Sequence, residues 1–247
     1  MNSEQQSNTH KKGRSWGTVL LLAVVAVVVL GLFWPPCCLS HGSLMRAVRT
    51  ASTQRTIINL STGIEAFKAD WDVYPPSSTA SGDAKRSGAE NLKYYLMGPQ
   101  GNGWGKPANG ATPIGGKSEA TYGPYFRQNP YVAEGGFDDS FRPTKPILYF
   151  RFERDLDPPY DVRDNPVDPT CVNGFASQEQ FELLVRPKDQ NGNRKWVRED
   201  YLLISPGADR CYGYVAEDRA TGKVRPARPE EIEKGEAFCD DIVNFRY

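Results

Sequence analysis

The stretch LSTGIEAFKADWDVYPP, residues Leu60–Pro76, decides how this chain folds. Its apolar side chains recur at three- and four-residue spacing, which is the pattern of a helix with one buried face. Ser43 is a predicted N-cap, and the two prolines at the end cannot continue a helix. The spacing therefore predicts an amphipathic helix over residues 43–74 that packs on its own domain. Its apolar stripe consists of Val48, Ile57, Leu60, Ile64, Phe67, Trp71 and Tyr74.

The region after this helix, residues 75–247, is predicted to hold loops and a small sheet. Its first part is dominated by Gly, Pro, Ser and Asn, with one short helix at Ala89–Pro99. An aromatic and aliphatic run predicts a strand at Pro146–Glu153. Asn191-Gly192 favours a hairpin between FELLVR and DYLLIS, whereas SQEQFELLVR also fits a helix capped by Ser177. A long helix followed by a small antiparallel sheet predicts an α+β fold.

Upstream of the helix, the segment WGTVLLLAVVAVVVLGLFW covers Trp16–Trp34 and contains no charged residue. About 19 residues at ~1.5 Å each are long enough to cross a ~30 Å hydrocarbon core. Tryptophans at both ends suit the two membrane interfaces. The segment predicts an uncleaved, single-pass transmembrane helix at residues 16–34, and a cleaved secretory signal is the alternative.

The flanks of this span suggest how the chain is oriented. Residues 1–15 are predicted to be a polar cytoplasmic tail, and residues 35–42 a linker rich in Pro and Cys. With the N-terminus inside, residues 43–247 form a domain outside the cytoplasm. All five cysteines then lie outside, where disulfides can form. The predicted location is the inner (cytoplasmic) membrane.

Composition limits the classes of function. The net charge of zero gives no reason to expect the strongly basic patch that binds nucleic acid, so no nucleic-acid partner is expected. The two histidines are His10 and His41, so the chain after residue 42 lacks histidine for catalysis or for a zinc site. We expect no catalytic residues. One acid-rich stretch is interpreted as a solvated loop and, alternatively, as a carboxylate enzyme site; its acids are Asp155, Asp157, Asp161 and Asp164.

Acidic residues lie in two stretches near the end of the chain. LLISPGADRCYGY (Leu202–Tyr214) carries the lone acid Asp209, and EAFCDDIVNFRY (Glu236–Tyr247) carries Asp240 and Asp241. Carboxylates that face each other repel unless a cation lies between them, and clustered carboxylates with loop carbonyls suit calcium. One hypothesis is that the three acids converge on a calcium ion; the alternative is that they face solvent.

The same two stretches contain cysteines. Cys211 and Cys239 flank one loop, and a disulfide between them would contribute roughly 3 kcal/mol by constraining the unfolded chain. In a domain outside the cytoplasm, this disulfide is the favoured interpretation. Cys37 and Cys38 lie beside the predicted membrane span, and Cys171 has no obvious partner.

The order of these features resembles the type II secretion pseudopilins and related type IV pilin-like proteins. The helix end is similar to the family pattern Y-x-x-D-x-x-x-Y-P, at Phe67, Asp70, Tyr74 and Pro75. The Asp, Pro and Tyr of a strand motif D-x-W-G-x-P-x-x-Y have counterparts at Asp139, Pro146 and Tyr149, with two more residues between Asp and Pro and without the Trp-Gly pair. The family's S-x-G-x-D-G and D-D-I-x-N are matched at Ser205, Gly207 and Asp209, and at Asp240, Asp241, Ile242 and Asn244.

The resemblance implies a pilin-like fold and a structural role in a type II secretion or type IV pilus-like system. It implies other pseudopilin or secretion-system subunits as partners, besides the membrane, and a homo-oligomer. It also implies calcium bound by Asp209, Asp240 and Asp241, with help from a carbonyl near Leu203 or Ser205.

The chain departs from the family near its N-terminus. Neither Gly13 nor Gly17 is followed by the family's F-T-L-x-E processing pattern, and the apolar run contains no glutamate. An alternative function is therefore an anchored surface binding module that no longer assembles into filaments. Its candidate binding aromatics are Trp104, Tyr122, Tyr125 and Phe126.

Overall fold

The computed structural model describes most of the chain after residue 40. The described ranges are residues 41–78, 86–99, 101–105, 121–126, 132–133, 135–218 and 221–245. The chain divides into two compact units, residues 1–45 and residues 46–247. The predicted tail, the predicted membrane span and Pro35-Pro36 lie outside the described ranges. Within those ranges, no helix has both the length and the apolar character that a membrane crossing requires.

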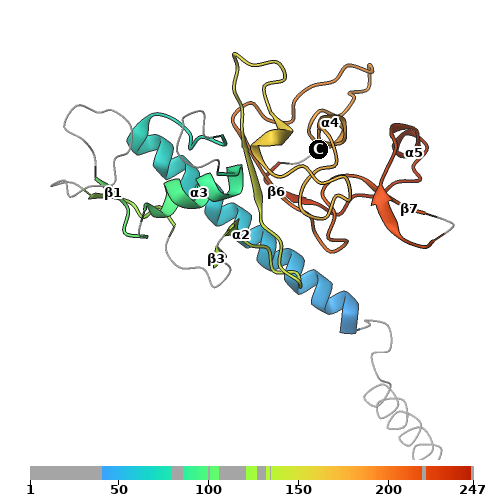
Figure 1. Cartoon of the computed structure of the whole chain (residues 1–247), viewed down its shortest axis with the longest axis horizontal. Helices are drawn as coiled ribbons and strands as arrows, with labels where there is room; N and C mark the ends of the chain where they lie inside the picture. Colours follow the sequence, from blue (N-terminus) through green and yellow to red (C-terminus); the bar gives the residue numbers. More distant parts are fainter. Residues whose placement is uncertain are drawn as a thin grey trace, which may run out of the picture. The chain divides into compact units, whose positions relative to one another are not determined.

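The fold is a mixed α+β arrangement of helices and small antiparallel sheets (Figure 1). Its central sheet has the strand order β5-β6-β9, formed by Leu148–Arg151, Tyr201–Ser205 and Ile242–Val243. In the first pair, Tyr149 lies opposite Leu203. The C-terminal strand β9 joins the other edge of β6, with Ser205 opposite Ile242. Segments distant in the sequence therefore meet along β6.

Both faces of this sheet are covered, which explains why its strands are largely apolar. Successive side chains of a strand point to opposite faces. Tyr149 and Leu203 belong to one core cluster, whereas their neighbours Leu148 and Leu202 belong to a second. Every residue of β6 is buried. The first cluster is shared with α2 and α3, and the second with α4.

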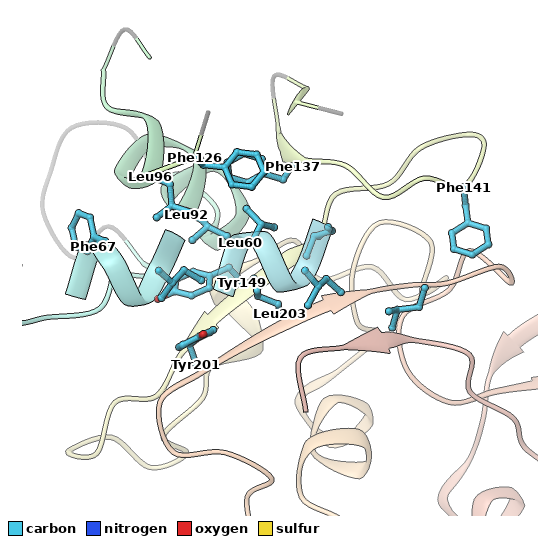
Figure 2. Close-up of a cluster of buried hydrophobic side chains, with 14 residues drawn as sticks. Leu60, Phe67, Leu92, Leu96, Phe126, Phe137, Phe141, Tyr149, Tyr201 and Leu203 are labelled. Atoms are coloured by element: carbon cyan, nitrogen blue, oxygen red, sulfur yellow. The ribbon is translucent and has the colours of Figure 1, made fainter. Parts of the chain in front are cut away.

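Helix α2, His41–Trp71, supplies much of the first cluster. Ile57, Leu60, Ile64 and Phe67 are each at most 1% exposed, which confirms the central part of the predicted stripe. Figure 2 shows Leu60 and Phe67 on α2 beside Tyr149 and Leu203 of the sheet. The helix is thus held by packing of one face, as the three- and four-residue spacing predicts.

The ends of α2 differ from the prediction. Ser43 lies within the helix and is not its N-cap, because α2 already includes His41. Val48 is 56% exposed and so does not belong to the buried stripe. The helix ends at Trp71, and the next residue, Asp72, has a left-handed backbone with φ 61°. That conformation ends a helix before the prolines are reached.

Helix α3, Gly88–Met97, confirms the predicted short helix. Ser87 and Glu90 form a capping box, in which each side chain bonds the other residue's backbone N–H. Figure 2 shows Leu92 and Leu96 of α3 in the same cluster as Leu60 of α2. Gly88 lies so close to β5 that a Cβ there would be 2.1 Å from the Tyr149 carbonyl oxygen. Glycine therefore allows the start of α3 to approach the sheet.

Asn165 joins the start of α3 to β5 and is expected to be important for stability. Its Oδ1 accepts from the Ala89 N–H at 3.0 Å, and its Nδ2 donates to the Tyr149 carbonyl at 2.8 Å. Since Asn165 is 4% exposed, Asn165→Ala leaves two buried groups without partners and is expected to lower the free energy of unfolding by about 2 kcal/mol in urea denaturation. Asn191→Ala, at an exposed turn, is the control. An equal, small loss for both variants would contradict this prediction.

Helix α4, Gln178–Val185, lies where the hairpin prediction placed a strand. The helical alternative for this segment is confirmed, with Ser177 as N-cap accepting from the Gln180 N–H at 3.2 Å. The apolar residues lie three and four apart and are buried together. They are Phe181, Leu184 and Val185.

The Asn191-Gly192 turn exists, but it does not join two strands of a hairpin. An isolated bridge between Lys188 and Arg194 is the antiparallel pairing beside it. β6 begins only at Tyr201 and pairs with β5 and β9. The strand partner predicted for β6 was therefore wrong, although the strand itself was predicted correctly.

Shorter elements complete the described fold. Three two-stranded antiparallel sheets surround the centre, with the pairs β1-β2, β3-β4 and β7-β8. Their strands are Trp104–Gly105, Thr121–Tyr122, Val132–Ala133, Gly136–Phe137, Val215–Glu217 and Val224–Pro226. A 3-10 helix, η1, spans Val162–Asp164, and the short helix α5 spans Pro229–Glu233.

Candidate functional site: an acidic cluster at the C-terminal loop

Asp209 lies in the loop that follows β6. The chain turns at Gly207, whose backbone is left-handed with φ 64°. Asp209 Oδ1 accepts a hydrogen bond from the Cys211 N–H at 2.9 Å, which orients the carboxylate within its own loop. Glycine is required at this turn for a second reason, because a Cβ on Gly207 would be 2.2 Å from the Asp240 carbonyl oxygen.

The C-terminal acids meet this loop just before β9. Asp240 Oδ2 accepts from the N–H groups of Ala208 and Asp209, at 2.9 and 3.1 Å. Asp241 Oδ2 accepts from the Gly213 N–H at 2.8 Å. The pairing of β9 with β6 positions both acids, because it places the residues before β9 beside the residues after β6. The structure therefore brings the three sequence-predicted acids into one cluster, termed the acidic cluster: Asp209, Asp240 and Asp241.

Each member of the acidic cluster has one buried oxygen without a hydrogen-bond partner in the described part of the chain. These atoms are Asp209 Oδ2, Asp240 Oδ1 and Asp241 Oδ1. Burial, with added repulsion from Asp240, raises the pKa of Asp209 to about 8. Burial and the nearby acids raise the pKa of Asp241 well above its usual value. Asp209 and Asp241 are therefore compatible with bound protons or with a cation, but not with two unbalanced charges.

The donor set of the acidic cluster fits calcium better than a transition metal. Carboxylate oxygens are hard ligands, and calcium takes six to eight of them, including carbonyls and water. Among the described residues, however, no group of three or more His, Cys, Asp or Glu side chains is already spaced as a metal site. The Leu203 carbonyl accepts from the Asn244 N–H at 3.2 Å and so is used within the sheet. Calcium binding stays a prediction, and it would require the three carboxylates to move closer together.

A buried ion pair beside the acidic cluster was not foreseen from the sequence. Arg210 Nη1 lies 2.8 Å from Asp139 Oδ2, and the Asp139 side chain is 0% exposed. The Ser205 hydroxyl also donates to Asp139, at 3.2 Å, and Arg210 donates to the Gly207 and Pro143 carbonyls. The pair therefore ties the loop before β5 to the loop that carries Asp209.

Both residues of this ion pair are unusual: Asp139 in its pKa and Arg210 in its backbone conformation. Burial raises the pKa of Asp139 despite the opposing effect of the Arg210 charge. Arg210 has a left-handed backbone with φ 69°, which is uncommon for a residue other than glycine. Asp139 was singled out as part of a motif, but no local pattern indicated Arg210 as its partner, since 71 residues separate them.

The cysteines of the two stretches are free thiols in the structure. Cys211 lies in a small buried cluster with Cys171 and Val215, whereas Cys239 packs against the second core cluster. The Cys211–Cys239 disulfide is therefore not formed in this structure. Cys37 and Cys38 lie outside the described residues.

The aromatic residues of the alternative binding site are used in local packing. Trp104 is 1% exposed and stacks on Tyr95 at 5.7 Å between ring centroids. The Tyr125 hydroxyl donates to Asp70 at 2.8 Å and accepts from the Trp71 indole at 2.9 Å. Phe126 is 7% exposed against Phe137, and Tyr122 contacts Trp71 edge-on. Trp104 and Phe126 are thus buried by local packing, whereas Tyr122 and Tyr125 are partly exposed.

In the acid-rich stretch, Asp161 and Asp164 line one pocket together with Glu153, whereas Asp155 and Asp157 do not line it. Asp155 and Asp157 are exposed, and Asp161 forms an ion pair with Arg163 at 2.7 Å. Asp164 accepts a hydrogen bond from Ser77 at 2.5 Å, and burial raises its pKa to about 6. The raised pKa of Asp164 is therefore explained by its burial beside Ser77, in the segment that follows α2.

Comparisons with known proteins give no match: no family model fits the chain, and neither curated sequences nor solved structures resemble it significantly.

Proposed function

We propose that the chain is a single-pass, membrane-anchored, pseudopilin-like protein. Its role would be structural, as a component or accessory of a type II secretion or type IV pilus-like system. The domain after residue 42 would lie outside the cytoplasm, anchored by residues 16–34 in the inner membrane. Calcium bound at the acidic cluster would hold its C-terminal loop.

The observation that carries this proposal is that separate motif segments of the resemblance contact one another. The Tyr149 hydroxyl donates to the Pro75 carbonyl at 2.6 Å, which joins the strand motif to the helix end. Ser205 donates to Asp139, as described above, and so joins the third motif to the strand motif. The fourth motif meets the third where Asp240 accepts from the Asp209 N–H. Motifs that form one contact network are more specific support than four short matches in a row.

The outer face of α2 supports a role in assembly. At 100° per residue, Val48 and Ile58 lie on the face opposite Leu60 and Ile64. Val48 and Ile58 are 56% and 58% exposed. We infer that these apolar side chains contact neighbouring subunits of the same kind of assembly.

The proposal is tested by assembly of the full chain in membranes. Secretion-system or pilus subunits are expected to co-purify with the wild-type protein after cross-linking. The double variant Val48→Glu, Ile58→Glu is expected to lose at least about tenfold of this recovery, because two charges on an interface disfavour its burial. Its melting temperature should stay unchanged, since both positions are exposed.

The exposed turn variant Asn191→Glu is the matched control and should retain the subunits. The mass of the mature N-terminus provides a second readout. Cleavage near Gly13 or Gly17 would favour a filament component, and an intact Met1 an accessory. Wild-type protein recovered without such subunits would contradict the proposal and favour the anchored binding module.

A further inference from the structure

Two loops distant in the sequence meet at a pair of cysteines. Cys171 lies in the loop between η1 and α4, and Cys211 in the loop after β6. Their side chains share a buried cluster with Val215, in which Cys171 is 0% and Cys211 5% exposed. The Cys211 thiol donates to the carbonyl of Thr170, the residue next to Cys171, at 3.9 Å. The backbones are also joined, because the Tyr212 N–H donates to the Cys171 carbonyl at 2.9 Å.

The loop that carries Cys171 is held in place independently of the thiol. The Asp168 carboxylate accepts from the N–H groups of Thr170 and Asn173, at 2.9 and 3.1 Å. Gly174 lies so close to Pro166 that a Cβ there would be 1.7 Å from the Pro166 carbonyl oxygen. Between Asp168 and Gly174, the backbone of Cys171 is left-handed, with φ 58°. The loop geometry therefore directs Cys171 into the interior beside Cys211.

We propose that Cys171 and Cys211 form a disulfide when the domain folds under oxidising conditions, in place of the Cys211–Cys239 pairing. Cys211 can bond only one partner. Cys171 shares its buried cluster, and the Cys211 thiol already contacts the carbonyl of Thr170, whereas Cys239 packs against the second core cluster. The compartment depends on the proposed orientation of the chain, but the pairing does not, because it follows from contacts within one domain.

The reaction is a thiol–disulfide exchange with an external disulfide, either a small molecule such as oxidised glutathione or a protein disulfide. One thiolate attacks a sulfur of that disulfide, forms a mixed disulfide and releases the first leaving thiolate. The second thiolate then displaces the other half. The two cysteines lose two electrons and two protons, and the external disulfide becomes two thiols. Because both sulfurs are buried in the folded protein, the exchange takes place during folding.

The Cys171–Cys211 disulfide would link the loop that contains Asp168 to the loop that contains Asp209. Its closed segment of about 40 residues is long, so its effect on the unfolded chain is large. For a domain of this size, the expected rise in melting temperature is roughly 10 °C. Reduction of the folded protein should be slow, because the bond is not accessible.

Peptide mapping of the full chain in detergent distinguishes the pairings. The protein is refolded with oxidised and reduced glutathione, unfolded without reductant, alkylated with N-ethylmaleimide and digested with trypsin. The cysteines fall on separate tryptic peptides: residues 164–188 hold Cys171, residues 211–219 hold Cys211, and residues 235–246 hold Cys239. The expected product links the first peptide to the second.

Two serine variants complete the test. Cys239→Ser should keep the linked peptides and the roughly 10 °C loss of melting temperature when the protein is refolded with reductant. Cys171→Ser should have neither, and its melting temperature should not respond to reductant. A link between the second and third peptides, or alkylation of both Cys171 and Cys211 in the oxidised protein, would overturn the proposal.

Discussion

Arg210→Ala is expected to lower the free energy of unfolding by about 3–5 kcal/mol, because it leaves a buried carboxylate without its counter-charge. Asp139 is 0% exposed and Arg210 only 16%, so the ion pair is largely shielded from solvent. The remaining donors to Asp139, among them the Ser205 hydroxyl and the Phe141 N–H, are neutral and do not balance its charge. Alanine retains the left-handed backbone at this position, so the variant measures the side chain. Urea denaturation at neutral pH gives the value.

A double-mutant cycle separates the ion pair from packing. Asp139→Asn combined with Arg210→Ala removes both charges and is expected to recover part of the loss. The cost of Arg210→Ala should also shrink as the pH falls through the raised pKa of Asp139, since the protonated acid needs no counter-charge. Arg163→Ala is the matched control, because Arg163 pairs with Asp161 at 81% exposure and should matter little. A loss no larger than that of the control would refute a structural role for the buried pair.

Without calcium, the free energy of unfolding is expected to fall as the pH rises from about 4 to about 8. The pKa of Asp209 is about 8 in the folded protein, against an ordinary value of 3.8. The pKa of Asp241 is raised in the same direction. A raised pKa means that the folded state binds the proton more tightly than the unfolded state. The stabilisation is therefore fully present below the ordinary value and is lost as the pH rises through the folded value.

Calcium is expected to reverse this trend. The ion binds ionised carboxylates and so competes with the protons of Asp209 and Asp241. Its stabilising effect should grow with pH, and calcium at 100 times its dissociation constant contributes about 2.7 kcal/mol. For a domain of this size, that corresponds to a rise in melting temperature of about 8 °C.

Melting temperatures at pH values of about 5, 6.5 and 8, with calcium or with a chelator, test both trends. Asp209→Ala and Asp241→Ala should abolish the gain from calcium and flatten the loss of stability with pH. Asp164→Asn is the matched control, because it removes an acid of raised pKa outside the cluster and should keep the calcium response. Arg46, which lies 3.7 Å from Asp240, is exposed and should have little effect. Equal destabilisation of the two alanine variants with calcium and with chelator would disprove the metal site.

Part of the candidate site could be predicted from the sequence, and part could not. Asp209, Asp240 and Asp241 were singled out by their position beside strands and by the family resemblance, and the structure places them together. The resemblance did not indicate that Arg210 would neutralise Asp139. Nor did any spacing indicate Cys171 as the neighbour of Cys211. Both contacts join loops whose relative position depends on the whole sheet.

The sequence by itself determined the elements whose pattern is local. The stripe from Ile57 to Phe67 predicts α2, because a helix repeats every 3.6 residues and one apolar face must be buried. The aliphatic run at Tyr201–Ser205 likewise suffices for β6. The residues of α4, by contrast, fit a strand as well as a helix capped by Ser177, so the sequence alone left that segment open.

Only the tertiary structure decided which segments these elements meet. An apolar strand requires other segments to pack on both of its faces and to pair with both of its edges. Its own residues do not specify which segments these are. Thus β6 pairs with β5 and with β9, and not across the Asn191-Gly192 turn. The segment that pairs with a strand is the one that completes its hydrogen bonds and buries its apolar side chains, and it can lie far away in the sequence. The same tertiary pairing brings together the acidic cluster, the Asp139–Arg210 pair, and Cys171 with Cys211.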